Sequence, residues 1–204
     1  MQALIAQSPG RLAWEEVPDP GPPGPAGALV RPVAVTTCDF DHLVVRGATA
    51  AQLPLAIGHE CVAEVLEVGG DVARVRPGDR VVVPFQVSCG ACAPCHAGRT
   101  NSCERMPWLS SFGLGALAGD FGGTMADLLS VPYADAMLVP LPAGVTLADG
   151  AACACNITDA HRCVAPGLAR HTGAPVLVVG GGFDSISLYS ARIAAALGAE
   201  RVDV

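Results

Sequence analysis

The feature that most constrains this chain is a run of four cysteines with the spacing C-x2-C-x2-C-x7-C. Gly90, Pro94 and Gly98 interrupt the run and allow the segment to fold back on itself. Four thiolates can therefore converge at the ~2.3 Å that a tetrahedral zinc site requires. Four protein ligands leave no coordination position for a substrate, so the run predicts a structural zinc site. Its ligands would be Cys89, Cys92, Cys95 and Cys103.

Two other interpretations of the run were weighed. Cys92, Cys95 and His96 also fit C-x-x-C-H, the pattern of covalent haem attachment, but that pattern leaves Cys89 and Cys103 unexplained. An iron–sulfur cluster also takes four cysteine thiolates, and the spacing alone does not separate it from zinc. Metal analysis would distinguish the two.

The composition describes a folded chain of one to two domains. Of the 204 residues, 51% are hydrophobic and 15% are charged, which is too apolar for disorder. The chain has twelve basic residues, all arginine, and nineteen acidic residues, so its net charge is -7. We therefore do not expect a nucleic-acid partner or binding to an anionic membrane. The longest apolar stretches fall far short of the ~20 residues that span a bilayer.

The cysteine number and the N-terminus indicate a reducing compartment. The chain has nine cysteines, so complete internal disulfide pairing is excluded. Residues 1–7 lack the cationic segment and the full apolar region of a signal peptide. We therefore expect a cytoplasmic protein whose cysteines serve metal binding or catalysis.

Short apolar segments separated by turn signals occupy the first part of the chain. Strands are predicted over 29–35, 62–68 and 80–83, with Pro32 indicating an edge or a bulge. The proline- and glycine-rich residues 18–27 are expected to form a surface loop. Together these segments predict a small β-barrel over the first ~140 residues.

The pattern changes after residue 150. A helix is predicted over 151–164, a strand over 176–179, and a second helix over 186–197 that ends at Gly198. Residues 201–204 resemble the start of another strand. We therefore expect a mixed α+β fold, with a barrel domain over 1–150 that carries the zinc lobe (85–105), followed by an incomplete α/β domain over 151–204.

The glycine loop between that strand and helix is a candidate dinucleotide site. Glycines at such a turn let the backbone approach a pyrophosphate at the helix N-terminus. G-x-G-x-x-G counted from Gly180 places Ser185 at the third position, whereas counting back from the helix selects Gly182, Asp184 and Ser187. Asp184 would add negative charge near phosphate, and a tight turn without ligand is the alternative. The candidate cofactor-binding residues are Gly180, Gly181, Gly182, Ser185 and Ser187.

A second set of possible ligands is dispersed along the chain. Gly58-His59-Glu60 precedes a predicted strand, and Cys38 and Cys155 lie outside the four-cysteine run. Two thiolates, one imidazole and an open position would form a catalytic zinc site. Such a zinc lowers the pKa of a bound hydroxyl, so a bound alcohol becomes alkoxide-like and can release hydride.

With these motifs, the whole chain resembles the zinc-dependent alcohol dehydrogenases of the medium-chain dehydrogenase/reductase family. The resemblance rests on residues 38–41, 58–60, 77–81, 122–127 and 176–199 and on the four-cysteine run. It implies a GroES-like β-barrel followed by a Rossmann domain, with a catalytic zinc between them. It also implies that Cys38, His59 and Cys155 are the ligands, that Glu60 can approach the metal, and that Asp41 orients His59.

The chain departs from the family at several positions. Phe40 stands where most members carry the serine or threonine that relays the alcohol proton, and Asp39 or His42 would have to substitute. Cys153 competes with Cys155 as third ligand, but the register of the following residues favours Cys155. Cys61 and Cys163 are expected to be small buried residues.

The chain also ends inside the family's nucleotide domain. The acid that would bind the adenosine ribose falls about two residues beyond Val204, so the sequence does not separate NAD from NADP. The resemblance implies two zinc ions, NAD or NADP, a small alcohol, aldehyde or ketone as substrate, and a possible homo-oligomer. The alternative is a zinc-binding fragment without catalytic activity.

Overall fold

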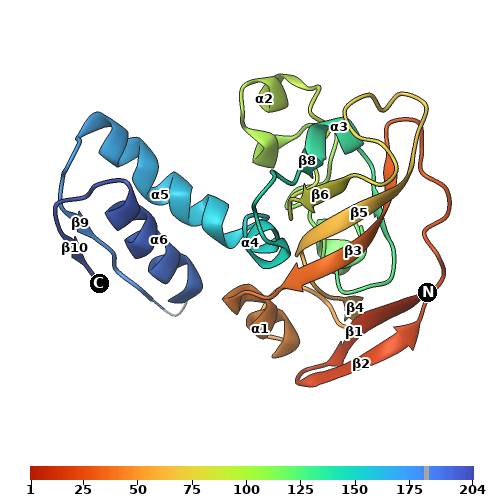
Figure 1. Cartoon of the computed structure of the whole chain (residues 1–204). Helices are drawn as coiled ribbons and strands as arrows, with labels where there is room; N and C mark the ends of the chain where they lie inside the picture. Colours follow the sequence, from red (N-terminus) through yellow and green to blue (C-terminus); the bar gives the residue numbers. More distant parts are fainter. Residues whose placement is uncertain (182–183) are drawn as a thin grey trace. The chain divides into compact units, whose positions relative to one another are not determined.

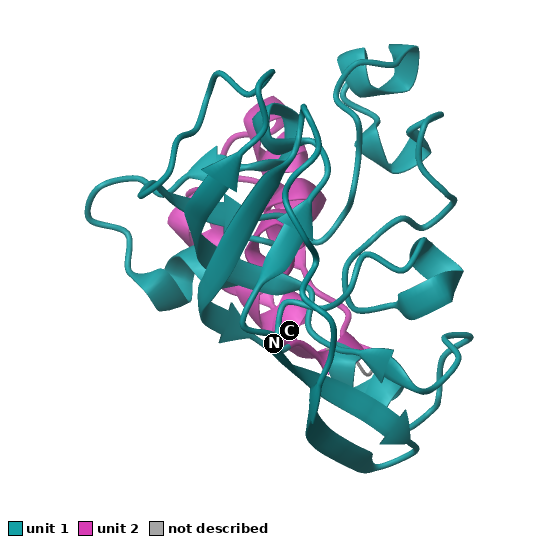
Figure 2. Cartoon of the chain, turned by 90° about the vertical axis from the view of Figure 1, so that its right-hand side faces the viewer, with its two compact units in different colours: residues 1–37, 41–154 teal, residues 38–40, 155–204 magenta. Residues whose placement is uncertain are grey.

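The computed structural model describes residues 1–181 and 184–204 and divides into two compact units. The larger unit comprises residues 1–37 and 41–154, and the smaller unit comprises residues 38–40 and 155–204 (Figure 2). Gly182, one of the predicted cofactor residues, lies outside the described residues. The predicted domain boundary at residue 150 stays a prediction.

A five-stranded antiparallel sheet forms the centre of the larger unit (Figure 1). Its order is β7-β3-β5-β6-β8. Alternate residues of β5, Cys61, Ala63 and Val65, face the main core, whereas Val62 packs on the opposite side against Ala151. Period-two alternation thus lets one strand serve two cores. The strands are β3 (Ala28–Thr36), β5 (Glu60–Val68), β6 (Arg80–Val83), β7 (Leu129–Val131) and β8 (Val139–Pro140).

A second sheet of three strands contains the N-terminus, with the order β2-β1-β4. Its strands are β1 (Gln2–Ser8), β2 (Arg11–Glu16) and β4 (Leu55–Ala56). An isolated bridge between Ala3 and Ala126 ties β1 to the segment that precedes β7. The two sheets form the small β-barrel that the strand pattern predicts and that the family resemblance implies to be GroES-like.

Short helices complete the larger unit. They are α1 (Asp39–Val45), whose first two residues belong to the smaller unit, α2 (Ala93–His96), α3 (Ala134–Met137) and α4 (Leu147–Ala152), with 3-10 turns η1 (Thr100–Ser102) and η2 (Gly115–Ala118). Thr146 caps α4 by accepting a hydrogen bond from the Asp149 N–H. A Cβ at Gly150 would lie 2.5 Å from Leu141, so glycine permits the close packing of α4 on the sheet.

The smaller unit contains a single β-α-β arrangement preceded by a helix. Strands β9 (Val176–Leu177) and β10 (Val202–Asp203) are parallel and are joined by helix α6 (Asp184–Ala196). Helix α5 (Asn156–Arg170) contributes Val164 and Leu168 to a core shared with Ala194 of α6. This arrangement is an incomplete Rossmann domain, as the sequence predicts.

Several sequence predictions need correction at the level of elements. The predicted continuous helix over 151–164 is wrong, because α4 ends at Ala152 and α5 begins at Asn156. Cys155 interrupts the helical path with a φ of -142° and a ψ of -75°. The predicted strand over 176–179 is also shorter, since β9 ends at Leu177. By contrast, the irregularity expected at Pro32 is confirmed as a register shift between Pro32 and Ala34.

Across the residues that the structure describes, we find no helix with the length and apolar character needed to cross a bilayer.

Candidate metal centres and glycine loop

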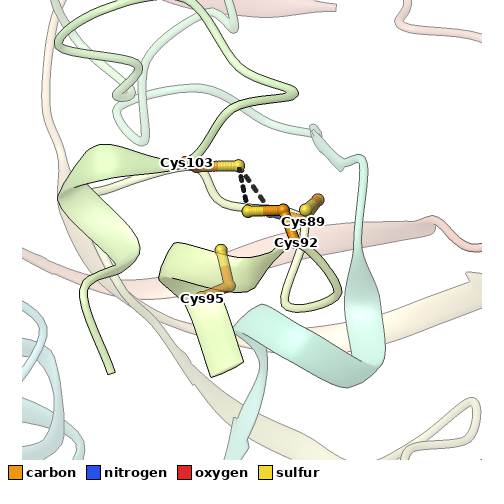
Figure 3. Close-up of side chains that lie close together, drawn as sticks. All are labelled: Cys89, Cys92, Cys95 and Cys103. Carbon is orange, nitrogen blue, oxygen red and sulfur yellow. Dashed lines mark hydrogen bonds between the residues drawn. The ribbon is translucent and has the colours of Figure 1, made fainter. Parts of the chain in front are cut away.

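The four cysteines of the run come together in one cluster, hereafter the cysteine cluster (Figure 3). The Sγ atoms of Cys89, Cys92, Cys95 and Cys103 all lie within 4.8 Å of one another. Cys92 precedes α2 and Cys95 lies within it, while Cys103 follows η1. Pro94 in the first turn of α2 suits a helix start, because its missing N–H has no partner there anyway.

Thiols within the cysteine cluster differ in pKa, because their hydrogen bonds and their burial differ. Hydrogen bonds from the backbone of Glu104 and Cys95 lower the pKa of Cys92 to about 6. Burial, together with a hydrogen bond to Cys92, raises the pKa of Cys95 to about 12. Four adjacent thiols cannot all ionise without a compensating cation, so this sulfur-only set fits zinc, and it also fits an iron–sulfur cluster.

The cysteine cluster is anchored to the rest of the unit through α3. A Cβ at Gly90, whose φ is +68°, would lie 2.4 Å from the Cβ of Ala136, so only glycine allows this approach. Asp135 accepts hydrogen bonds from the N–H groups of Ala73 at 2.9 Å and Arg74 at 2.8 Å. These contacts fix the helix against which the cysteine loop packs.

The second predicted site is represented by a buried group of four residues, hereafter the mixed cluster: Cys38, Asp41, His59 and Glu60. Their ligand atoms all lie within 4.8 Å of one another. His59 Nδ1 lies 3.2 Å from Asp41 Oδ1, and its Nε2 lies 3.6 Å from Glu60 Oε1. The imidazole thus has a carboxylate on each side.

The local backbone explains how His59 and Glu60 are held. Glu60 begins β5 and is fully buried, while Gly58 adopts a φ of +92° immediately before them. A Cβ at Gly113 would lie 2.7 Å from the carbonyl oxygen of Gly58, and a Cβ at Gly58 would lie 2.7 Å from the Thr124 hydroxyl, so both positions require glycine. The Phe85 ring packs edge-on against His59 with centroids 6.2 Å apart. No motif in the sequence singles out Phe85.

The donor set of the mixed cluster fits a zinc ion. A histidine that donates Nδ1–H to a carboxylate presents the lone pair of Nε2 to a metal. Imidazole nitrogen, thiolate sulfur and carboxylate oxygen are the three donor types that zinc accepts. Cys155 is not in the group; it begins the main stretch of the smaller unit, and its role as third ligand stays a prediction.

Of the predictions for the two remaining cysteines, one is confirmed and one is wrong. Cys61 is buried as expected, and burial raises the pKa of its thiol to about 12. The expectation for Cys163 is wrong, because it is exposed on α5. The buried positions of that helix include Ala160, Val164 and Leu168, and residue 163 lies off this stripe.

At the glycine loop, two of the predicted cofactor residues lie at the start of α6. Ser185 donates both its backbone N–H and its hydroxyl to Oδ2 of Asp39, at 2.9 and 2.7 Å. A Cβ at Gly180 would lie 3.5 Å from the Ser187 hydroxyl. The loop therefore packs on the helix start, and a carboxylate from residue 39 already occupies the N–H of Ser185.

Comparisons with known proteins agree with this architecture. Residues 24–143 match the alcohol dehydrogenase GroES-like domain. A glutathione-independent formaldehyde dehydrogenase of Pseudomonas aeruginosa is 32% identical over 217 aligned positions, covering 100% of this chain and 53% of the relative.

Two solved structures show the same relationship. Alcohol dehydrogenase TADH from Thermus sp. ATN1 superposes with a TM-score of 0.87 and 30% identity, covering 99% of this chain and 57% of that one. A cobalt- and zinc-bound thermostable alcohol dehydrogenase from Pyrobaculum aerophilum superposes with a TM-score of 0.71 and 28% identity, covering 98% of this chain and 58% of that one. The chain thus spans little more than half the length of these proteins. It belongs to the zinc-dependent alcohol dehydrogenases of the medium-chain dehydrogenase/reductase family and matches their N-terminal portion.

Proposed function

We propose that this chain is part of a zinc-dependent oxidoreductase that exchanges a hydride between an alcohol or carbonyl substrate and NAD or NADP. The catalytic zinc would be held by Cys38, His59 and Cys155, with Glu60 able to approach it. The observation that carries the proposal is the His59–Asp41 contact of 3.2 Å beside the thiol of Cys38. Residues 1–150 would provide Cys38, His59 and Glu60, and residues 151–204 would provide Cys155 and begin the cofactor domain.

The residues of the mixed cluster prepare the site for its metal. Asp41 accepts a hydrogen bond from His59 Nδ1, which fixes the tautomer and directs Nε2 toward the ligand position. Burial of His59 and Glu60 keeps water away from the donors and strengthens their electrostatic interactions. When bound, zinc supplies Lewis-acid polarisation of the substrate oxygen.

The proton that leaves an alcohol needs a carrier other than residue 40. Phe40 has no exchangeable proton on its side chain. Asp39 bonds to Ser185, which engages its carboxylate at the helix start. His42 on α1 is exposed to solvent and its imidazole can accept and release a proton, so we assign the proton path to His42.

The cysteine cluster would hold a second zinc with a structural role. Its four sulfur donors leave no position open for a substrate. A bound zinc would close the loop of residues 89–103 on itself, which would order this part of the larger unit and take no part in the chemistry.

The decisive test uses the protein as its gene encodes it. Zinc content is measured by mass spectrometry, and cofactor reduction is followed with a panel of small primary and secondary alcohols. Two zinc ions per chain and turnover that disappears in His59→Ala, with one zinc retained, support the proposal. Absence of turnover with both zinc ions bound contradicts the catalytic part.

A second candidate function is zinc binding without catalysis. It is favoured by the Asp39 carboxylate, which accepts the N–H of Ser185 at the start of α6. Tight NAD binding by the chain argues against this candidate. In either case we expect small-molecule rather than nucleic-acid or membrane partners, and possible self-association.

A further inference from the structure

The start of α6 is the place where a dinucleotide bound to this kind of fold puts its pyrophosphate. The first N–H groups of a helix have no partners within it, and the helix dipole adds partial positive charge there. Together they form an anion position. In this chain the N–H and the hydroxyl of Ser185 both donate to one oxygen of Asp39.

Asp39 offers the same chemistry as a phosphate oxygen. It is a negatively charged acceptor that takes one backbone N–H at 2.9 Å and one hydroxyl at 2.7 Å. Two anionic oxygens cannot accept these donors at the same point, and their charges repel. We propose that Asp39 is an internal anion that holds the phosphate position of the glycine loop, and that a dinucleotide binds there only after displacing it.

Neighbouring charges add to the effect. Asp184, the first residue of α6, has its Oδ1 3.9 Å from the Cβ position of Gly180, so a second carboxylate lies at the loop. Two arginines of the same unit, Arg162 and Arg201, pair with Asp159 and Asp203 at 2.7 and 2.8 Å. The carboxylates of Asp39 and Asp184 therefore lie near the start of α6, where a pyrophosphate would be placed, and the expected affinity for a dinucleotide is low.

The inference rests on the cofactor class of the proposed function, and it is tested by binding alone. NADH is titrated into the wild type, Asp39→Asn and Asp149→Asn, each loaded with zinc, and the fluorescence of NADH is followed; NADPH is titrated in parallel. Asparagine keeps an oxygen acceptor for Ser185 but removes the charge. Asp149 is the matched control, because its carboxylate bonds to Thr146 at the start of α4 in the larger unit.

We expect the dissociation constant for NADH to fall about tenfold or more in Asp39→Asn, equivalent to about 1.4 kcal/mol, and to stay unchanged in Asp149→Asn. Asp39→Ser is the second variant and guards against misfolding of the first. The Ser185 amide resonance, which reports the contact without any ligand, should shift in both Asp39 variants.

Equal NADH affinity in the wild type and both Asp39 variants would overturn the proposal. So would absence of NADH binding in all of them, because removal of the carboxylate would then have opened no site. Failure of the proposed function looks different, namely bound zinc and tighter NADH binding in the Asp39 variants without alcohol turnover.

Discussion

The cysteine cluster and the mixed cluster both fit a divalent metal, but the chain builds them in different ways. The cysteine cluster takes all its donors from one short segment, residues 89–103, and all are sulfur. The mixed cluster joins Cys38 and Asp41 to His59 and Glu60 at the start of β5, with sulfur, nitrogen and oxygen donors. One is a local loop, and the other is a product of the tertiary fold.

This difference predicts how each site responds to loss of its metal. A short loop of four thiols has little else to define it, so metal binding and ordering of the loop are one event. The mixed cluster is held by protein contacts, since Asp41 bonds to His59 and Gly58 packs on Gly113. We therefore expect the cysteine cluster to depend on its metal for structure and the mixed cluster to depend on the fold.

The largest effect is expected from Cys103→Ser. Loss of one sulfur donor should remove one zinc per chain and destabilise the larger unit by about 3 kcal/mol or more, because metal-binding energy is folding energy in such sites. Zinc analysis and the midpoint of urea unfolding measure both quantities. Cys163→Ser, on the exposed face of α5, is the control and should change neither. Retention of both zinc ions in Cys103→Ser would show that Cys103 is not needed to hold a zinc ion in the cysteine cluster.

Gly113→Ala tests whether the fold holds the mixed cluster. The added Cβ would lie 2.7 Å from the Gly58 carbonyl oxygen, at a residue whose φ is +73°. We expect the free energy of unfolding to fall by about 2–3 kcal/mol. Gly144→Ala is the matched control, since Gly144 has a φ of +85° with no atom within 4 Å of the Cβ position. Gly144→Ala adds only the backbone strain of a positive φ and should lower the free energy of unfolding by about 1 kcal/mol. Equal losses measured by urea unfolding would show that the close approach is not needed.

Asp41→Asn is expected to weaken metal binding at the mixed cluster without unfolding the protein. The amide removes the charge beside His59 Nδ1, and loss of such a partner costs about 10–100-fold in metal affinity. Competition with a chromophoric chelator measures that affinity. Asp135→Asn, at the anchor of the cysteine cluster, is the matched control and should leave this affinity unchanged. An unchanged affinity in Asp41→Asn would mean that Asp41 does not orient His59.

The same contrast explains how much could be predicted from the sequence. The convergence of the four cysteines was predicted, because they follow one another at a spacing that leaves little choice of geometry; that they bind zinc stays a prediction. The location of His59 immediately before a strand was also correct, although Glu60 is already the first residue of that strand, and the run 80–83 is β6 as predicted. The contact between Asp39 and Ser185 could not be predicted, since it joins residues 146 positions apart in the chain.

Predictions of elements failed where tertiary packing decides. The break between α4 and α5 depends on Ala151 packing against Val62 while Cys155 leaves the helical region. Strands β1 and β2 are joined by Pro9-Gly10, which is itself a turn signal, but no strand is predicted on either side of it, and their pairing from Gln2 to Glu16 emerged only in the structure. Whether Cys163 faces the core depends on which stripe of α5 is buried, and the sequence of that helix does not settle it.

The two cysteines with contrasting burial offer the smallest and most direct test, because they show how a thiol behaves outside both clusters. Burial raises the pKa of Cys61 to about 12, so only about one thiol in ten thousand is ionised at pH 8. Cys163 is exposed on α5. Iodoacetamide at pH 8 should therefore label Cys163 in the native protein and spare Cys61, while urea should make both reactive. Mass spectrometry of tryptic peptides gives the result. Equal labelling of the two in the native state would contradict the burial of β5, and with it the rigid strand on which His59 and Glu60 depend.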